Sequence, residues 1–267
     1  MGSPHFRTGF YQFYPRFGRV EENLEKVLRA LEDIKADLVV LPELAFTGYY
    51  FESREETLNL AEDLANSPTL ASLTRLCREN GFHLVTGFAE KAGAKIYNSA
   101  LLIGPDGLVS TYRKLHLFNT EKDCFDPGNL PLPVVDVGGV KIGMMVCFDW
   151  VFPEAARTLA LRGAELICHP SNLVLPYCQQ AMTTRCLENR VFAVTANRIG
   201  TEKRPHGKLT FTGRSQITAP GGSILHRAAP DEEVVYVMEI DVTLARDKNL
   251  TPKNHLFQDR RPEYYIE

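Results

Sequence analysis

Hydrophobic positions along the chain follow two different periods. In residues 20–35 they recur every three or four positions, which places them on one face of an amphipathic helix. Residues 6–13 form a strand-like apolar run, and residues 37–42 form a shorter, all-apolar run. A continuous apolar run is typical of a strand that is buried on both faces. The N-terminal part therefore predicts a strand, a helix and a second, buried strand.

Three later segments are also predicted helices. Ser67 and Pro68 begin the first, because serine caps a helix and proline fits its first turn, and the Asn-Gly pair at 80–81 ends it. Residues 153–163 and 179–190 form the other two. Strand-like runs occupy residues 82–89, 98–104, 108–113, 140–148, 166–169, 192–197, 216–219, 223–226 and 234–240.

Turn residues connect some of these strands directly. Pro-Asp-Gly at 105–107 and Pro-Gly-Gly at 220–222 have the residue types of hairpin turns. Because hairpins alternate with strand–helix units, we expect a mixed α/β sheet that is covered by helices rather than a purely parallel sheet. No linker, repeat or low-complexity tract divides the sequence, so we expect a single domain over residues 1–267.

Composition and charge narrow the choice of partners. The 267 residues are 44% hydrophobic and 24% charged, which are ordinary globular values and allow a core without disulfide or metal support. The net charge of −3 disfavours nucleic acid as a partner. The longest apolar run, residues 142–148, is far too short to span a membrane, and no secretion leader is evident. We therefore expect a cytoplasmic protein.

Six cysteines form no CxxC pair and have no zinc-like spacing with histidine, so we expect reduced thiols. They stand at positions 77, 124, 147, 168, 178 and 186, and Cys124 and Cys178 fall in predicted loops. The sequence also lacks the GxSxG, GxxxxGK[ST], HExxH and GxGxxG motifs, which disfavours simple serine hydrolases, P-loop NTPases, zincins and dinucleotide-binding enzymes. We expect no metal and no organic cofactor.

Glu43 is the first candidate for chemistry. It stands in "LVVLPELAFTGY", directly after a predicted buried strand, and active sites of α/β proteins collect at strand ends. Desolvation there raises a carboxyl pKa toward neutrality, which suits a general base. A helix-capping or salt-bridging glutamate is the alternative interpretation.

Lys114 is the second candidate, in "VSTYRKLHLF". Strand alternation puts Arg113 and Lys114 on opposite faces, so one can be solvated while the other lies inside. A buried lysine can stabilise an oxyanion or lower the pKa of a thiol. A pair of exposed bases is the alternative.

Cys147 is the third candidate, in "IGMMVCFDWVFPE" at the end of the predicted strand 140–148. A turn and a helix follow, as in a nucleophile elbow, where main-chain N–H groups can stabilise an oxyanion. The alternative is a core cysteine. A cysteine nucleophile usually needs a base, and His116 and His169 are candidates for a cysteine–histidine pair.

Three blocks resemble the signature blocks of the nitrilase superfamily, the carbon–nitrogen hydrolases. They are "LPELAFTGYYF", "YRKLHLF" and "VCFDWVFPEAARTLALRGAELICHPSNL", with 33 residues from Lys114 to Cys147. The similarity continues through "YNSALLIGPDG", "RCLENRVFAVTANR" and "DRRPEYY", and so covers nearly the whole chain. The resemblance implies a four-layer α-β-β-α sandwich. It further implies a homodimer, in which two sandwiches form eight layers, or a larger even oligomer.

The resemblance also implies roles for individual residues. Glu43 corresponds to the general base, Lys114 to the electrostatic stabiliser and Cys147 to the nucleophile. Glu121, in "FNTEKDCFDPG", corresponds to a second glutamate that helps position substrate, with a solvated loop charge as the alternative. The main-chain N–H of Phe148 is expected to complete an oxyanion site. Because Glu43 then acts as base, the histidines lose their catalytic interpretation.

The family hydrolyses small amides, nitriles and carbamoyl compounds, so we expect a small amide or nitrile as substrate, and ammonia and a carboxylic acid as products. The segment "CFDW…FPE" is more typical of the amidase-like branches, and some short thermophilic nitrilases share it. Tyr49, Trp150 and Asn172 are candidate pocket walls, with core or dimer packing as the alternative for the first two. Arg185 could bind the carboxylate of an N-carbamoyl substrate, or pair with Glu188. A cysteine–histidine acyltransferase and a non-catalytic scaffold are the alternatives of a different class.

Overall fold

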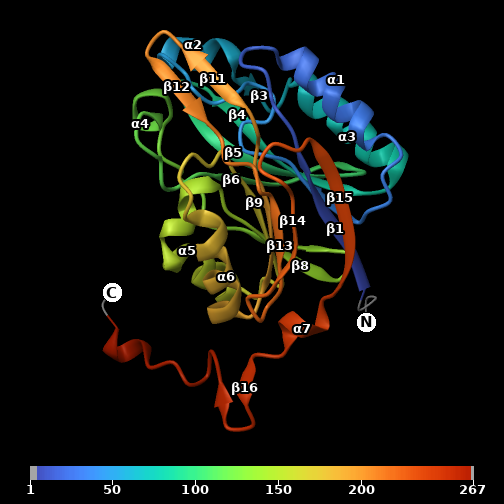
Figure 1. The fold of residues 1–267 in the computed structure, drawn as a ribbon, viewed down its shortest axis with the longest axis vertical. Helices are drawn as coiled ribbons and strands as arrows, with labels where there is room; N and C mark the ends of the chain where they lie inside the picture. Colours follow the sequence, from blue (N-terminus) through green and yellow to red (C-terminus); the bar gives the residue numbers. More distant parts are fainter. Residues whose placement is uncertain (1–4, 266–267) are drawn as a thin grey trace.

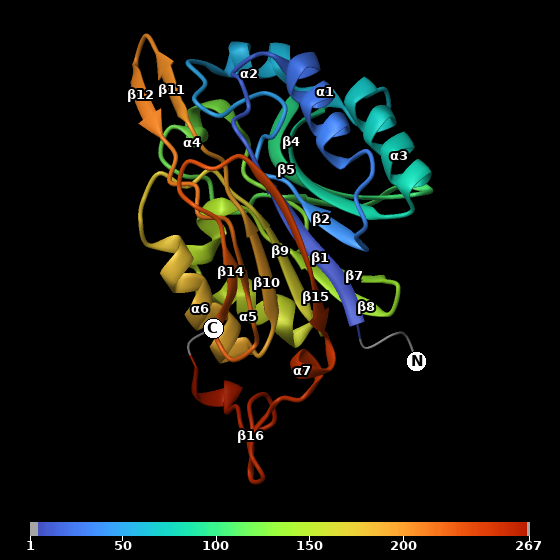
Figure 2. The same cartoon turned by 45° about the vertical axis from the view of Figure 1, so that its right-hand side comes forward.

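The computed structural model describes residues 5–265, which form two face-to-face β-sheets, each with helices packed on its outer face. Figures 1 and 2 show the resulting order of helix, sheet, sheet and helix layers. This arrangement confirms the four-layer α-β-β-α sandwich and the mixed character of the sheets.

The first sheet contains strands from both the N-terminal and the C-terminal parts of the chain. Its strands run in the order β15 (Val234–Asp241), β1 (His5–Gln12), β2 (Leu38–Val40), β4 (His83–Ala92), β5 (Lys95–Gly104) and β6 (Gly107–Arg113), with β3 (Glu62–Asp63) paired to β4. β1, β2 and β4 are parallel, and the other long neighbours are antiparallel. Helices α1 (Val20–Leu31) and α3 (Pro68–Asn80) cover its outer face.

The second sheet has a similar plan. Its strands run in the order β14 (Ile224–Arg227), β13 (Gln216–Thr218), β10 (Phe192–Ala196), β9 (Leu166–Pro170), β8 (Val140–Met144) and β7 (Val134–Val137). The parallel strands β8, β9 and β10 lie at its centre. Helices α5 (Pro153–Leu161) and α6 (Cys178–Asn189) cover its outer face.

Side chains along β2 alternate between the two faces of the first sheet, one of which packs on the second sheet and the other on helices. Leu38 and Val40 of β2 belong to the core between the sheets. Val39, between them, packs instead with α1 and α3. All three are fully buried, which explains why this strand has no polar positions in the sequence.

The helix start and stop predicted from Ser67 and Gly81 are confirmed at the ends of α3. The Ser67 hydroxyl accepts a hydrogen bond from the Leu70 N–H at 2.9 Å, and Gly81 has the left-handed φ of 70° that ends the helix. The prediction for residues 20–35 was too long, since α1 ends at Leu31 and the chain then turns to start β2 beside β1.

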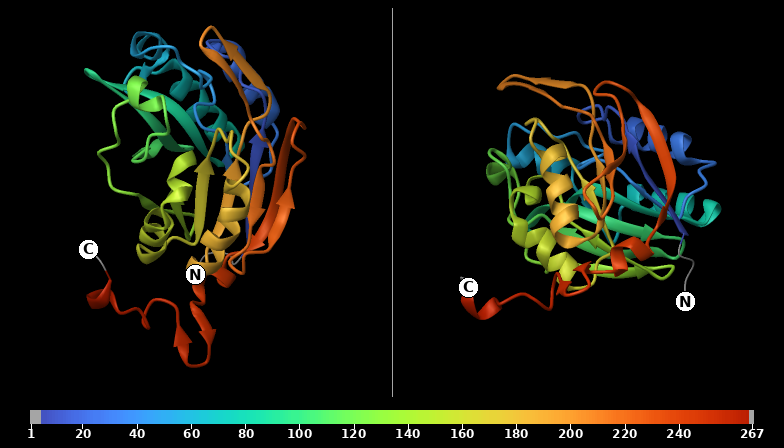
Figure 3. Two further views of the ribbon diagram at one scale, coloured as in Figure 1. Left: turned by 60° about the vertical axis from the view of Figure 1, so that its left-hand side comes forward. Right: turned by 60° about the horizontal axis from the view of Figure 1, so that its bottom comes forward.

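Several short elements were missed because they are too short to carry a periodic pattern. They are α2 (Arg54–Leu60), α4 (Glu121–Cys124), β11 (Thr201–Arg204), β12 (Gly207–Thr210), α7 (Thr243–Arg246), β16 (Asn249–Thr251), β17 (Asn254–His255) and η2 (Pro262–Tyr264). The last three belong to a C-terminal arm that follows α7 and extends away from the sandwich (Figures 1 and 3). Within residues 5–265 no helix has the length and apolarity needed to cross a membrane.

Candidate active site

The three candidate residues come from both sheets and meet inside the sandwich. Glu43 follows β2, Lys114 follows β6, and Cys147 follows β8 after two further residues. Their exposed fractions are 0%, 1% and 5%. The exposed-base alternative for Lys114 is therefore wrong, and the neighbouring Arg113 pairs with Glu90.

Lys114 joins two carboxylates. Its Nζ lies 2.6 Å from Glu43 Oε1 and 2.8 Å from Glu121 Oε1. Asn98 Nδ2 also donates to Glu43 Oε1, at 2.7 Å. The second oxygen, Glu43 Oε2, is buried and has no hydrogen-bond partner among the residues that the structure describes. Glu43 is thus held through one oxygen while the other can still accept a proton.

Glu121 is buried with the other two rather than solvated. It begins the short helix α4, and Tyr49 donates its hydroxyl hydrogen to Glu121 Oε1 at 2.6 Å. The Phe118 N–H donates to Oε2 at 3.2 Å. All of these partners are donors, which fits a carboxylate. Burial raises the pKa of Glu121, while the Lys114 charge opposes the rise.

Cys147 does not lie in a strand, contrary to the prediction from the sequence. The strand predicted over residues 140–148 ends at Met144, and Cys147 begins a 3₁₀ helix, η1 (Cys147–Val151), with a positive φ of 41°. Few residues other than glycine adopt this conformation. The carboxylate of Asp149 stabilises the turn, because it accepts hydrogen bonds from the Val146 N–H and the Tyr112 hydroxyl, both at 2.8 Å.

The environment of Cys147 keeps its thiol protonated. Burial, together with the negative charge of Glu43, raises the pKa of this thiol well above its ordinary value. The Lys114 charge and a hydrogen bond from the Asn172 main chain act in the opposite direction. Burial alone would lower the pKa of Lys114, but the charges of Glu121 and Glu43 raise it. At neutral pH the site therefore holds a charged lysine and a thiol that needs a base.

The rings of His116 and His169 hydrogen-bond to groups other than the Cys147 thiol. His169 is buried, and its Nε2 lies 2.9 Å from the Cys147 carbonyl oxygen, so it donates to the main chain. Burial lowers the pKa of His169 to about 4, which leaves the ring neutral. His116 Nδ1 lies 2.7 Å from Asp149 Oδ1, and its ring stacks on Phe152. Both rings support the turn around Cys147.

A small cavity of about 20 Å³ lies beside Cys147. Its walls are Phe118, Cys147, Phe148, Trp150, Asn172, Leu173, Val174 and Leu175, which include two of the three predicted pocket residues. The third, Tyr49, is buried in contact with Glu121. Arg185 pairs with Glu188 at 3.0 Å and donates to the Trp150 carbonyl, as in the ion-pair interpretation. Cys124 and Cys178 are buried in α4 and α6 rather than in loops.

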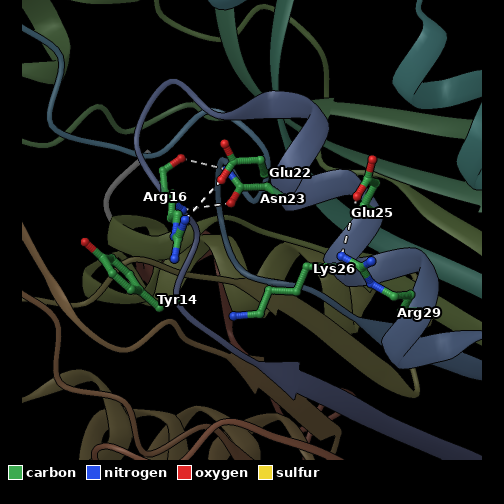
Figure 4. Close-up of a pocket in the computed structure, with 7 residues that line it drawn as sticks. All are labelled: Tyr14, Arg16, Glu22, Asn23, Glu25, Lys26 and Arg29. Atoms are coloured by element: carbon green, nitrogen blue, oxygen red, sulfur yellow. Dashed lines mark hydrogen bonds and ion pairs between the residues drawn. The ribbon is translucent and has the colours of Figure 1, made fainter.

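A larger hollow of about 270 Å³ lies elsewhere, beside α1 (Figure 4). Its charged side chains are paired: Arg16 with Glu22, Arg29 with Glu25, and Lys26 with Glu233. The amide of Asn23 bonds to the main chain of Arg16 and Phe46. None of the candidate residues borders it. We interpret this hollow as a solvated ion-pair surface.

Gly87 is a position that sequence patterns did not single out. A Cβ at Gly87 on β4 would overlap the main chain of Glu43 and Leu44. The Gly87 N–H donates to the Pro42 carbonyl at 3.1 Å, so the two segments are in direct contact. Leu44 itself has a positive φ of 48°. Because glycine has no side chain, the main chain at Glu43 can pack directly against β4 at Gly87.

We expect Gly87→Ala to lower the free energy of unfolding by about 1–3 kcal/mol and activity by more than tenfold, because the added methyl displaces Glu43. Gly221→Ala is the matched control, since no heavy atom lies within 4 Å of a Cβ there. Thermal unfolding and amide hydrolysis check both variants. Equal Tm and activity for the two would contradict this role of Gly87.

Comparison with known proteins agrees with this geometry. Residues 7–249 match the carbon-nitrogen hydrolase family. A nitrilase from Pyrococcus abyssi (strain GE5 / Orsay) is 45% identical over 263 residues, which cover 97% of this chain and 99% of the relative.

Solved structures share the fold over almost the whole chain. A carbon-nitrogen hydrolase from Helicobacter pylori G27 has a TM-score of 0.89 at 27% identity, covering 98% of this chain and 97% of the other. A variant of the amidase from Nesterenkonia sp. AN1, with acrylamide added to its active-site cysteine, has a TM-score of 0.78 at 26% identity, covering 97% of each chain. The chain therefore belongs to the carbon-nitrogen hydrolase family and is an enzyme that hydrolyses carbon–nitrogen bonds.

Proposed function

We propose that this enzyme hydrolyses a small uncharged amide through a thioester on Cys147, with Glu43 as general base and Lys114 as the charge that stabilises the oxyanion. The unpartnered oxygen Glu43 Oε2 is the observation that carries the proposal. The Glu43 charge acts on the Cys147 thiol, and Oε2 is the carboxylate oxygen that is free to take the thiol proton. The acrylamide adduct on the cysteine of the related amidase supports Cys147 as nucleophile.

Acylation begins when Glu43 Oε2 takes the thiol proton and the sulfur attacks the amide carbon. The carbonyl oxygen becomes an oxyanion, which the Lys114 ammonium and the Phe148 main-chain N–H stabilise. As the C=O bond re-forms, the C–N bond breaks and the nitrogen takes the proton from Glu43. Ammonia leaves, and the acyl group remains on Cys147 as a thioester. Glu121 holds Lys114 in place and helps position the substrate.

Deacylation uses the same base. Glu43 takes a proton from water, whose oxygen attacks the thioester carbon and forms the carboxylic acid. The C–S bond breaks, and the proton returns from Glu43 to the sulfur. A nitrile would first form a thioimidate on the same sulfur, and the relative named as a nitrilase keeps this substrate class as the second candidate.

The cavity walls favour an uncharged acyl group. Apart from Cys147 and Asn172, the residues that border the cavity are apolar or aromatic, and none carries a charge. Burying an unpaired carboxylate or ammonium among them would cost several kcal/mol. Arg185 is engaged by Glu188 and does not border the cavity, so N-carbamoyl amino acids are disfavoured.

Ammonia release from matched compounds tests this proposal. The panel pairs propionamide with propionitrile, succinamate and N-carbamoylglycine, each at the same concentration. We expect turnover of propionamide and at least about 100-fold lower kcat/KM for the two carboxylates. Release of ammonia from the carboxylates alone would contradict the proposal.

Lys114→Met should lower kcat by roughly 150-fold with a smaller change in KM, because about 3 kcal/mol of oxyanion stabilisation is lost. It should also shift alkylation of Cys147 by iodoacetamide to higher pH, since the Lys114 charge lowers the thiol pKa. Lys141→Met, at an exposed position on β8, is the matched control. A raised KM with unchanged kcat would contradict the role of Lys114.

We also propose that the protein assembles as a homodimer or a larger even oligomer through the outer face of α5 and α6. Leu161 and Leu187 on these helices are 44% and 52% exposed. Light scattering at micromolar concentration should give at least twice the chain mass of 30.0 kDa. Leu187→Arg should reduce that mass, whereas Leu108→Arg, at an exposed position on β6, should not. A 30 kDa particle for the unsubstituted protein would contradict the assembly.

A further inference from the structure

Asn172 connects the nucleophile, the base and the cavity. It follows β9 by two residues and is 2% exposed. Its main chain hydrogen-bonds to the Cys147 sulfur, and its Nδ2 donates to the Glu43 carbonyl oxygen at 2.8 Å. The same residue borders the cavity beside Cys147.

The side-chain oxygen of Asn172 has no donor. A carbonyl oxygen can only accept, so the contact with Glu43 fixes which atom of the Asn172 amide is nitrogen and leaves Oδ1 as the other. Across residues 5–265, no hydrogen-bond donor reaches Asn172 Oδ1 or Glu43 Oε2, although both atoms are buried. A buried acceptor without a donor costs about 1–3 kcal/mol, which a ligand with N–H groups can recover.

Substrates of this enzyme class differ in what they can donate. A primary carboxamide carries two N–H donors on its nitrogen and an acceptor on its oxygen. A nitrile carries only an acceptor, and so does an ester. If the substrate oxygen contacts Lys114 and the Phe148 N–H, the nitrogen lies on the opposite edge of the planar amide group. Of the three unpartnered acceptors of Glu43, Asn98 and Asn172, only Asn172 Oδ1 belongs to a residue that borders the cavity, and it matches an N–H group that an amide has and a nitrile lacks.

We propose that Asn172 Oδ1 accepts one N–H of the substrate –NH₂ group and thereby makes the enzyme select primary amides over nitriles of the same acyl chain. This inference rests on the proposed function. The hydrogen bond holds the nitrogen beside Glu43, which gives it the proton taken from the thiol. The C–N bond then breaks, the nitrogen leaves as ammonia, and the oxyanion electrons re-form the C=O bond.

Propionamide and propionitrile test the inference because both end in the same propionyl thioester. We expect Asn172→Ala to lower kcat/KM for propionamide about 10–100-fold more than for propionitrile. Asn98→Ala is the matched control. Asn98 is also buried, also donates to Glu43 and also has an unpartnered oxygen, but it does not border the cavity. This variant should lower both values by the same factor. An unchanged amide-to-nitrile ratio in Asn172→Ala would overturn the inference.

Two further measurements test the inference even if Asn172→Ala folds poorly or if propionitrile is not hydrolysed. Asn172→Asp keeps an acceptor oxygen and loses the donor to Glu43, so its amide-to-nitrile ratio should stay within about threefold of the unsubstituted enzyme. A ratio as low as that of Asn172→Ala would count against the acceptor role. In the Cys147→Ala background, which holds substrate without turnover, Asn172→Ala should weaken propionamide binding about tenfold and propionitrile binding less than twofold.

Failure of this inference is distinguishable from failure of the proposed function. If the unsubstituted enzyme hydrolyses neither compound, the proposed function is wrong and the inference falls with it. If it hydrolyses propionamide while Asn172→Ala reduces binding of both compounds equally, Asn172 only positions Glu43 and the proposed function stands.

Discussion

Cys147→Ala should abolish turnover of every substrate while leaving the fold intact. The variant removes the sulfur that forms the thioester, and no neighbouring group in the proposed mechanism can replace it. The side chain is 5% exposed, and alanine fits the same space. Ammonia release should fall to the background rate, and the thermal unfolding midpoint should remain close to that of the unsubstituted protein.

Cys168→Ala is the matched control for this loss. Cys168 lies fully buried in β9, and burial alone raises the pKa of its thiol. This cysteine has no place in the proposed mechanism, so its variant should keep most of the activity. Measurable turnover by Cys147→Ala above that background, or equal losses in the two variants, would remove Cys147 from the mechanism.

Glu43→Gln should lower kcat by about 10³-fold or more, because the base acts in both acylation and deacylation. Glutamine keeps an oxygen for the contacts with Lys114 and Asn98 but cannot take a proton. The remaining activity should rise with pH beyond pH 9. Burial still raises the pKa of Cys147 after the Glu43 charge is removed, so the reactive thiolate forms only at high pH. Rates measured from pH 6 to 10 check this.

The opposite result has a clear meaning. Near-normal hydrolysis by Glu43→Gln at neutral pH would exclude the glutamate base and revive the cysteine–histidine alternative. In that case the contact of His169 with the Cys147 carbonyl would have to change, and His169→Asn would become the inactive variant.

Local signals in the sequence explain which parts of the fold were predictable. The cap at Ser67 and the stop at Gly81 act within a few residues, so the bounds of α3 follow from residue types alone. The end of β8 does not follow from residue types, because the turn after it is held by Asp149. The Asp149 carboxylate accepts a hydrogen bond from Tyr112, which is 37 residues away in sequence. Only the folded structure brings these side chains together.

The same distinction holds for the site. Strand ends and family resemblance identify Glu43, Lys114 and Cys147, because each lies beside a recognisable apolar run. Asn98 lies inside a strand and carries no such signal, although it donates to Glu43. Asn172 was predicted only as a pocket wall. Its unpartnered oxygen depends on the orientation of one amide group, which a sequence does not encode locally.

Trapping the covalent intermediate tests the central claim most directly. Enzyme mixed with propionamide and quenched in acid within the first turnovers should carry an added propionyl mass, and peptide mapping should place it on the peptide that contains Cys147. Cys147→Ala should show no added mass under the same conditions. A propionyl group on Cys124 or Cys178 with Cys147 unmodified, or turnover without any adduct at any quench time, would contradict the thioester mechanism.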